Sequence, residues 1–411
     1  MHQFPADFLW GVASAGHQTE GDNAASDCWF AENVTPTVFE ERSGKACDGW
    51  ERWREDVDLA AAMNLNAYRF SVEWARVEPV EGEFSAAAVA HYEAIVDHCV
   101  ERGLAPVVTF HHFVAPHWFA ARGGWLDAEA PERFARFCDR IMAAFGDRIA
   151  VAVTMNEPNL PPMLAWAGLP DFVRDLERAT LEACTRAAGV ERYRLTNITV
   201  PEEAGALLAG QAAGHRAARA AIKARRADLP VGLSIAIVDD LVHGPDPTLR
   251  DRKRAEVYQP WLEIAREDDF IGVQNYERHH YDAKRAVNAD GTPAEGGVMN
   301  RTDPASLGSC ARYAHAVSGV PVLVTEHGMQ ADDDTKRAAF IEPSLAGLQQ
   351  AMDAGVPVLG YFHWTLVDNF EWIFGFGPKL GLHGFDPVTF ERTPKPSAGR
   401  YGDLVAELRR G

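Results

Sequence analysis

The sequence predicts an α/β protein built as a single (β/α)₈ TIM barrel with elaborated βα loops, and three observations support this prediction. Short apolar, β-branched runs alternate with stretches of helical periodicity, and eight such repeats follow one another along the chain. The length of 411 residues suits one large barrel with insertions. Hydrophobic residues make up 47% of the chain, so a large core can form, and no linker or low-complexity tract divides it.

Eight apolar runs are the candidate strands of this barrel. Each run is short and rich in β-branched or aromatic residues, which favour extended backbone. In chain order they are Phe8–Ala13, Ala67–Ser71, Ala105–Phe110, Ile149–Met155, Val231–Val238, Phe270–Gln274, Val320–Thr325 and Val356–His363.

Helical periodicity fills the stretches between these strands. It is clearest in residues 55–64, 91–103, 131–146, 204–226 and 337–355. Gly103, Gly146 and Gly355 follow such stretches and are the expected C-caps, whereas the acidic run 332–334 is the expected N-terminal cap of the last of them. We expect one domain over residues 1–411, with a loop insertion after the fourth strand at about 160–204 that contains its own helix.

Composition and charge argue against nucleic acid and membranes as partners. The formal net charge of −19 repels phosphate backbones and anionic lipids. No run approaches the roughly 20 apolar residues of a membrane helix. The N-terminal segment MHQFPADFLWG lacks the pattern of a signal peptide, and the six cysteines include no CxxC pair. We therefore expect a cytoplasmic protein with reduced thiols, whose oligomeric state the sequence does not indicate.

Two predicted strands end on carboxyl side chains. The fourth strand runs into Asn156 and Glu157, and the seventh into Glu326. Chemistry in this fold belongs at the C-terminal ends of the strands. Two carboxyl groups that face each other suit hydrolysis of a glycosidic bond, one as a protonated acid and the other in its ionised form. We therefore expect Glu157 to be the proton donor, Glu326 the nucleophile, and Asn156 a partner of a sugar hydroxyl.

Other strand ends add polar and aromatic side chains to the same predicted mouth. Indole faces stack on the apolar faces of sugar rings, amides pair with hydroxyls, and an arginine keeps a neighbouring carboxylate ionised. The residues concerned are Gln18 and Glu20 after the first strand, Arg69 in the second, His111 and His112 after the third, Asn275 and Tyr276 after the sixth, and Trp364, Glu371 and Trp372 after the eighth.

These motifs resemble glycoside hydrolase family 1, the β-glucosidase and β-galactosidase type, nearly from end to end. The resemblance rests on FLWGVASAGHQTEG, YRFSVEWARVEP, TFHHF followed by Pro116, TMNEP, DFIGVQNY, VTEHG and WTLVDNFEW, in the family's order. It implies a retaining β-glycosidase, best a β-glucosidase, that works through a covalent glycosyl-enzyme on a β-glycoside without cofactor or metal.

The resemblance also implies roles for single residues. Glu157 takes the place of the acid/base and Glu326 that of the nucleophile. Arg69 takes a supporting position beside the carboxylates, as does Tyr276. Gln18, His112, Asn156, Asn275, Trp364, Glu371 and Trp372 take positions that bind the sugar or flank the carboxylates.

The chain departs from the family pattern at three places. His327 replaces the Asn of the usual TENG motif, and Phe113 with Val114 replaces a usual Trp and Asp. The family's Asn-Tyr-Tyr motif, aligned on Asn275, puts Glu277 where the second Tyr should contact the nucleophile. Tyr276 or Tyr281 could supply the missing hydroxyl.

Three other functions compete with this reading. Glu277 and His327 would fit a catalytically impaired sugar-binding barrel. A 6-phospho-β-glycosidase would need a phosphate cradle, but the last loop offers only Lys379, and Glu371 is a like charge. A metal-dependent hydrolase could use histidines such as His112 and His117, but no HxH pair ends the first strand. His111 is expected to be a packed strand residue, and the pair at 279–280 a solvated loop.

Overall fold

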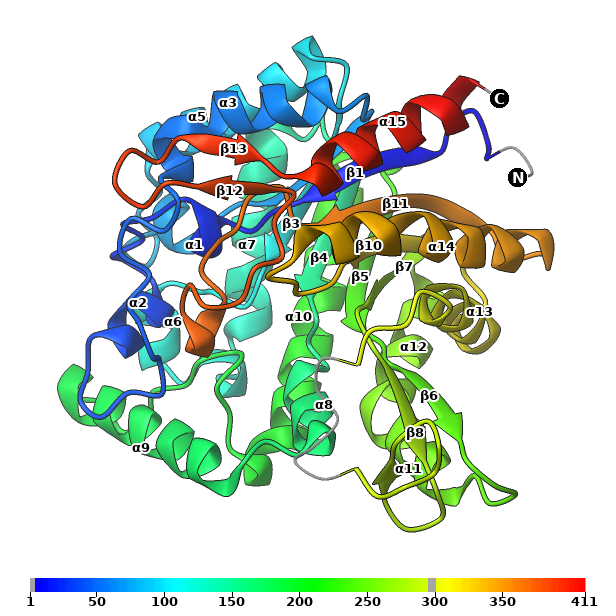
Figure 1. The fold of residues 1–411 in the computed structure, drawn as a ribbon. Coiled ribbons are helices and arrows are strands. Elements are labelled where there is room, and N and C mark those ends of the chain that lie inside the picture. Colours follow the sequence, from blue (N-terminus) through cyan, green and yellow to red (C-terminus); the bar gives the residue numbers. More distant parts are fainter. Residues whose placement is uncertain (1–3, 295–300, 411) are drawn as a thin grey trace.

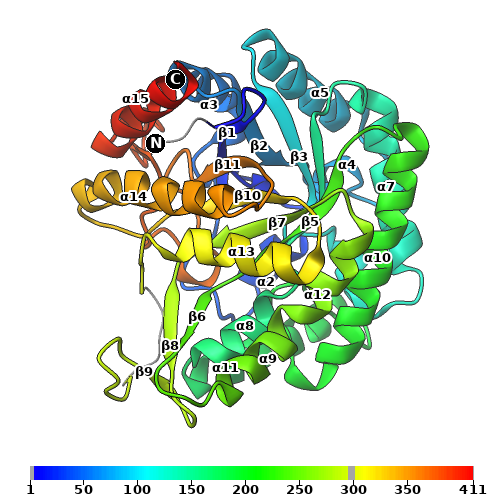
Figure 2. The same cartoon turned by 90° about the vertical axis from the view of Figure 1, so that its right-hand side faces the viewer.

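A computed structural model describes residues 4–294 and 301–410 and contains a closed barrel of eight strands. All neighbouring barrel strands pair in parallel. Helices surround this barrel in both views (Figure 1, Figure 2), so the predicted fold class is confirmed. Around the barrel the order is β1 (Leu9–Ala13), β11 (Val358–Trp364), β10 (Val322–His327), β7 (Phe270–Asn275), β5 (Val231–Ala236), β4 (Val151–Asn156), β3 (Ala105–His111) and β2 (Ala67–Ser71).

The predicted fifth strand is too long, because its last two residues leave the barrel. Beyond Ala236 the chain turns into β6 (Asp239–Val242), which pairs with β8 (Arg278–Tyr281) in a small sheet completed by β9 (Ala286–Val287). A separate hairpin joins β12 (His383–Phe385) to β13 (Arg392–Pro394). The sequence did not predict either small sheet.

Helices form the outer layer and decorate the loops at the mouth. The outer helices are α3 (Gly49–Ala62), α5 (Ala86–Glu101), α7 (Ala130–Phe145), α10 (Ala204–Arg225), α12 (Gln259–Ile264), α13 (Ser306–Ser318), α14 (Asp334–Asp353) and α15 (Pro396–Arg410). The loop helices are α1 (Gly16–Thr19), α2 (Asp27–Glu32), α4 (Trp74–Val77), α6 (His117–Ala121), η1 (Gly124–Leu126), α8 (Leu160–Ala167), α9 (Asp171–Ala188), η2 (Pro201–Glu203), α11 (Thr248–Val257), η3 (Ala265–Glu267) and η4 (Trp372–Phe374).

Three of the four predicted helix caps have the expected form. Gly103 and Gly355 have positive φ angles of 74° and 94°, which a side chain would disfavour. Asp333 accepts a hydrogen bond from the amide of Thr335 at the start of α14. Gly146 is the C-cap residue of α7, as predicted, but its φ is −61°, so close packing against Met142 rather than a positive φ explains the glycine.

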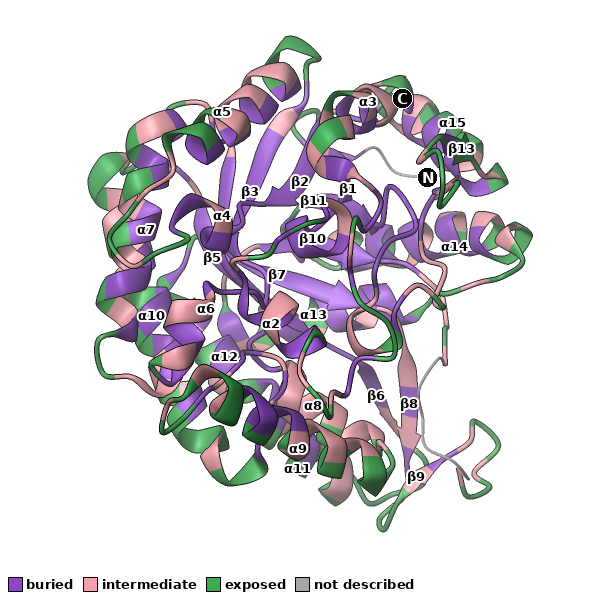
Figure 3. Cartoon of the chain, turned by 90° about the vertical axis from the view of Figure 1, so that its left-hand side faces the viewer, coloured by how far each residue is buried: buried purple, intermediate pink, exposed green. Residues whose placement is uncertain are grey.

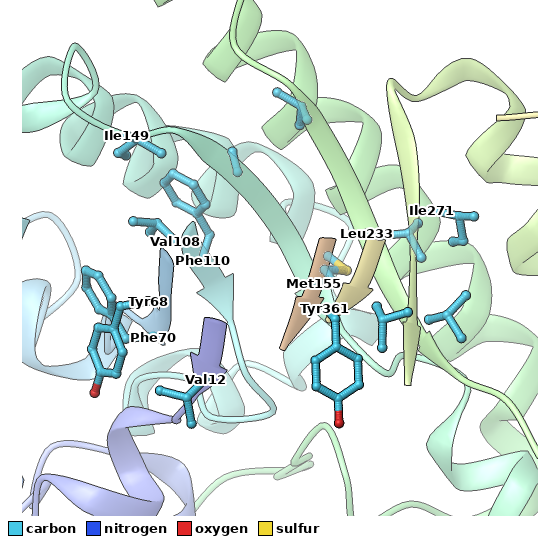
Figure 4. Close-up of a cluster of buried hydrophobic side chains, with 14 of the residues drawn as sticks. Val12, Tyr68, Phe70, Val108, Phe110, Ile149, Met155, Leu233, Ile271 and Tyr361 are labelled. Carbon is cyan, nitrogen blue, oxygen red and sulfur yellow. The ribbon is translucent and has the colours of Figure 1, made fainter. Parts of the chain in front are cut away.

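Two hydrophobic layers hold the barrel. One fills its interior and includes Val107, Val153, Phe270 and Leu323. The other lies between strands and helices and includes Phe110, Met155 and Ile271, part of which Figure 4 shows. Figure 3 shows the buried strands at the centre and exposed residues on the outer faces of the helices. Alternate residues of a strand face opposite sides, so each strand contributes to both layers.

Shifts in strand register aim Asn156 and Glu326 into the mouth. The pairing of β4 with β5 shifts between Val153 and Asn156, and that of β10 with β7 shifts between Val324 and Glu326. Strict alternation from Leu323, an interior residue, would turn His327 inward. The shift turns Glu326 inward instead, which is how bulges re-aim side chains next to active sites.

Three further findings concern the described residues as a whole. None of their helices is long and apolar enough to cross a membrane. All six cysteines are buried and free. No group of three or more His, Cys, Asp or Glu side chains is arranged to hold a metal ion in these two ranges.

Candidate active site

A cavity of about 650 Å³ opens at the C-terminal ends of the barrel strands. Its lining includes side chains from six of the seven motifs, and the segment YRFSVEWARVEP contributes none. The predicted site residues among them are Gln18, His112, Asn156, Glu157, Tyr276, Glu326, Trp364, Glu371 and Trp372.

Glu326 sits in a set of donors that favours its ionised form. The Arg69 guanidinium donates to its Oε1 at 2.5 Å, and the Tyr276 hydroxyl donates to its Oε2 at 2.6 Å. Burial raises the pKa of Glu326, and the charge of Arg69, followed by the Tyr276 and Arg69 hydrogen bonds, opposes that rise. Arg69 itself is fully buried behind the cavity, so it acts through Glu326 and Asn156.

Glu157 lacks comparable support and therefore keeps its proton. Burial raises its pKa well above the ordinary value, and the nearby charge of Glu326 raises it further, against a smaller opposing effect of Arg69. Its backbone lies at a φ of 43°, in the left-handed region that a non-glycine residue rarely adopts. One carboxyl group of the pair is thus suited to donate a proton, and the other to carry the negative charge.

Asn156 is held by three donors so that its NH₂ group faces the cavity. Its Oδ1 accepts hydrogen bonds from Arg69 Nη2 at 2.6 Å, Gln274 Nε2 at 2.7 Å and Ser234 Oγ at 3.2 Å. Its Nδ2 lies 3.3 Å from His112 Nε2. Burial, followed by the charge of Arg69, lowers the pKa of His112 well below its ordinary value. His112 is therefore a neutral hydrogen-bonding group in this site.

Glu371 and Gln18 form the polar end of the cavity. The Gln18 amide donates to Glu371 Oε2 at 3.3 Å and to the carbonyl of Phe370 at 2.9 Å. Burial raises the pKa of Glu371 to about 8, and the Trp364 hydrogen bond opposes this. The Glu371 Oε1 and Gln18 Oε1 atoms are buried without a hydrogen-bond partner in the structure. Two unsatisfied acceptors in one cavity match a ligand rich in hydroxyl groups.

Aromatic rings flank this polar end. The His112 ring stacks against Trp364 with centroids 5.7 Å apart and against Trp372 with centroids 6.1 Å apart. Phe113, which departs from the family pattern, contacts Trp372 edge to face and also lines the cavity. The substitution thus keeps an aromatic wall beside the polar end.

The structure corrects the predicted place of Asn275. Its side chain points out of the barrel, where its amide donates to the carbonyls of Ile237 and Glu277 and its Oδ1 accepts from Ser306. Asn275 does not line the cavity, whereas Gln274 and Tyr276 do. Because β7 alternates regularly from Phe270, Gln274 faces inward and Asn275 faces the other way.

This correction also shows which of these residues contacts Glu326. The alignment on Asn275 was one residue out of register, and Tyr276, not Glu277, occupies the position of the second Tyr. Tyr281 is engaged elsewhere, with Lys253 at 3.0 Å. Glu277 is hydrogen-bonded to His279 at 2.6 Å.

His327 does not disturb the catalytic pair. Its ring faces away from the mouth, where it lies 3.0 Å from the Tyr361 hydroxyl and stacks on Phe340. Burial lowers the pKa of His327 to about 3, so it adds no charge beside Glu326. His111 is likewise a packed residue, since it lies against Trp125 and Thr196.

One interpretation of the sequence is wrong on the outer side of the cavity. His279 was expected in a solvated loop, yet it is buried in β8 and lines the cavity. Sequence reasoning also missed Gln274 and the apolar wall made by α8. That wall consists of Leu160, Met163, Leu164 and Ala167.

The mouth of this parallel barrel holds one protonated carboxyl group and one carboxylate bound by arginine. Stacked aromatic rings lie beside them. Together these features define an O-glycosyl hydrolase. The sequence model of glycosyl hydrolase family 1 matches residues 1–178 and 310–409, which is more than half of the chain. The protein belongs to this family.

Individual relatives agree with this assignment over nearly the whole chain. The crystal structure of β-glycosidase BGL167 is 42% identical, has a TM-score of 0.90, and aligns over 98% of this chain and 97% of that one. The apo structure of a β-glucosidase, 1317, is 36% identical with a TM-score of 0.90, over 97% and 98% of the two chains. β-Glucosidase A of Thermotoga maritima is 27% identical over 98% of both chains.

Proposed function

We propose that the protein is a retaining β-glucosidase that hydrolyses terminal, non-reducing β-D-glucosyl residues by double displacement. The observation that supports this best is the unequal environment of the two carboxyl groups. Glu157 is held protonated by burial and by Glu326, whereas Glu326 is bound by Arg69 and Tyr276. An acid and a nucleophile at the ends of different strands are what this reaction requires. Relatives named β-glucosidase share the chain's full length.

The two steps use these residues in turn. Glu326 attacks the anomeric carbon and forms a glycosyl ester, while Glu157 gives its proton to the departing glycosidic oxygen. Glu157, now ionised, takes a proton from a water molecule, whose oxygen attacks the anomeric carbon and releases Glu326. Each step inverts the anomeric centre once, so the released sugar keeps the β configuration.

NMR of the first-formed sugar tests this proposal. With an aryl β-glucoside as substrate, we expect the β-anomer of glucose to appear before mutarotation adds the α-anomer. Initial release of the α-anomer would show inversion and overturn the double-displacement mechanism. A panel of aryl β-galactosides, β-fucosides and β-xylosides in the same assay ranks the sugars.

The 6-phospho-β-glycosidase alternative finds no support at the polar end of the cavity. Among the described residues that line the cavity there is neither a lysine nor an arginine, so a phosphate there would have no positive charge beside it. The Lys379 ammonium is bound to the carbonyl of Phe376 instead. We expect no activity on 6-phospho-β-glucosides. Faster hydrolysis of the phosphorylated substrate than of the neutral one would replace the β-glucosidase proposal with this alternative.

A further inference from the structure

The outer part of the cavity has two chemically different walls. Leu160, which begins α8, follows Glu157 by three residues, so the apolar side chains of α8 lie on the side of the proton donor. Because Glu157 protonates the departing oxygen in the proposed reaction, this is the side of the leaving group. Glu277 and His279 also line this cavity. His279 lies in β8 and Glu277 directly precedes it, and the small sheet β6–β8–β9 lies beside α8 in two views (Figure 1, Figure 3).

Glu277 belongs to a buried row of polar side chains. Its Oε2 lies 2.6 Å from His279 Nε2, and His279 Nδ1 lies 3.5 Å from the Tyr281 hydroxyl. Tyr281 in turn accepts a hydrogen bond from Lys253 at 3.0 Å, and Lys253 is paired with Asp240 at 2.6 Å. The side chains of Lys253 and Asp240 are 1% and 0% exposed, so this end of the row is fixed in the interior.

The row has one consistent direction of hydrogen bonding. A lysine ammonium can only donate, so the Tyr281 oxygen accepts from it and its O–H is free to donate to His279 Nδ1. Burial raises the pKa of Tyr281, which keeps that proton in place. His279 then carries its proton on Nε2, and this N–H donates a hydrogen bond to Glu277. Glu277 is therefore held from behind as an acceptor, with 19% of its side chain exposed toward the cavity.

We propose that Glu277, positioned by His279, selects the leaving group of the substrate: it favours an apolar ring that bears a hydrogen-bond donor and disfavours an anionic one. The apolar wall of α8 would pack against the ring, while the carboxylate would accept the donor. This inference rests on the proposed function and adds the class of aglycone to it. It also gives a role to an acidic cavity residue that catalysis does not use.

Five aryl β-glucosides separate this proposal from plain hydrophobic binding. The 4-hydroxyphenyl and 4-methoxyphenyl glucosides have leaving groups of similar acidity and size, so the ratio of their kcat/KM values reports the donor. The same ratio is measured for the 3-substituted pair, which places the donor elsewhere on the ring. The 4-carboxyphenyl glucoside carries a better leaving group but an added negative charge.

The unaltered protein should prefer the hydroxylated over the methoxylated substrate by about 10-fold or more, as expected for a hydrogen bond to a charged acceptor. In Glu277→Leu this ratio should fall to about 1, and in Glu277→Gln, which retains an acceptor but no charge, it should lie between. In both variants, kcat/KM for the 4-carboxyphenyl glucoside should rise relative to kcat/KM for the 4-methoxyphenyl glucoside. Glu407→Gln, an exposed change on α15, is the matched control and should keep the ratios of the unaltered protein.

The proposal would be overturned if the ratios of kcat/KM between these substrates were the same in the unaltered protein and in both Glu277 variants. Ratios are taken within each variant, so a general loss of activity or of folded protein does not imitate the result. β-Glucosyl fluoride, whose leaving group is too small to reach the outer wall, reports the proposed function separately. If the unaltered protein fails on the fluoride as well as on the aryl glucosides, the β-glucosidase function itself is wrong, not only the role of Glu277.

Discussion

At the scale of single residues, the chemistry of the site depends on which groups contact each of the two carboxyl side chains. Glu326 is bound by Arg69 and Tyr276, and both contacts oppose the rise in pKa that burial causes. Glu157 is buried with the charge of Glu326 nearby and is left protonated. The same residue type thus takes two roles because the hydrogen-bond partners differ.

Removal of the proton donor should affect poor leaving groups most. In Glu157→Ala, we expect kcat/KM for alkyl glucosides to fall by roughly 10²–10⁴-fold, and that for dinitrophenyl glucosides to fall far less. Azide should restore activity by attacking the glycosyl-enzyme, since no carboxylate repels it, and should give β-glucosyl azide. Equal losses on both substrate types, without an azide product, would assign the proton donor to another residue.

Loss of the Tyr276 hydroxyl should make Glu326 harder to ionise. The hydrogen bond from Tyr276 lowers the pKa of Glu326, so Tyr276→Phe should raise that pKa. The acidic limb of the kcat/KM profile should then move to higher pH, with a loss of roughly 10-fold or more on its acidic side. Tyr313→Phe, outside the cavity, is the control. An acidic limb that moves equally in both variants, or in neither, would contradict this role.

At the scale of elements, register shifts and close helix contacts place the site. The shifts in β4 and β10 turn Asn156 and Glu326 toward the mouth. Helix α10 supports β4 from outside, since His215 on this helix lies 2.7 Å from the hydroxyl of Thr154. Its Gly210 packs directly on the backbone of Trp125, so that an added Cβ would overlap the Trp125 carbonyl oxygen.

Two glycines of α10 should respond to alanine in opposite ways. Gly210→Ala should lower the free energy of unfolding by about 1–3 kcal/mol, because the helix must move away from η1. Gly205→Ala, on the same helix with open space around its Cα, should raise it by about 0.5–1 kcal/mol through helix propensity alone. Urea denaturation measures both. A stabilising Gly210→Ala would mean that α10 does not pack this closely.

At the scale of the whole molecule, charge and buried carboxyls act together on stability. The chain has a net charge of −19, and several of its acids are buried rather than solvated. Burial raises the pKa of Asp27 to about 7, of Glu20 to about 7 and of Glu371 to about 8. Surface acids such as Glu81 and Asp139 differ, because hydrogen bonds from arginines outweigh their slight burial and lower their pKa values.

Thermal stability should therefore be highest near pH 5 and fall toward pH 9. Between the ordinary carboxyl pKa values and about 7 to 8, the folded protein binds more protons than the unfolded chain, so stability decreases as pH rises. Below about pH 4 the surface carboxylates become protonated, so the stabilisation from their pairs with arginines is lost. In Asp27→Asn, the fall in melting temperature between pH 5 and pH 9 should be smaller by on the order of 5 °C. Calorimetry from pH 4 to 9 is the measurement.

Asp403→Asn, an exposed change on α15, is the control and should keep the full decline. A melting temperature that rises from pH 5 to pH 9 would show that the buried acids ionise without cost. That result would also place the pKa of Glu371 near its ordinary value.

The sequence by itself determined the barrel and the residues at its strand ends. Eight apolar runs predicted the eight barrel strands to within two residues at every end, because burial on both faces leaves a continuous signal. The motifs named Glu157, Glu326 and seven more of the residues that line the cavity. Even the place of Tyr276 could have been read correctly, since strict alternation from Phe270 puts residues 274 and 276 on the inner face.

Only the tertiary structure decided what depends on a partner distant in sequence. The register shift that turns Glu326 inward and His327 outward arises from pairing with β7, and alternation along one strand cannot show it. His279 looked like a loop residue because β8 is short and polar, and pairing with β6 buries it. The row from Lys253 to Glu277 likewise joins two elements through contacts between side chains, which no local pattern records.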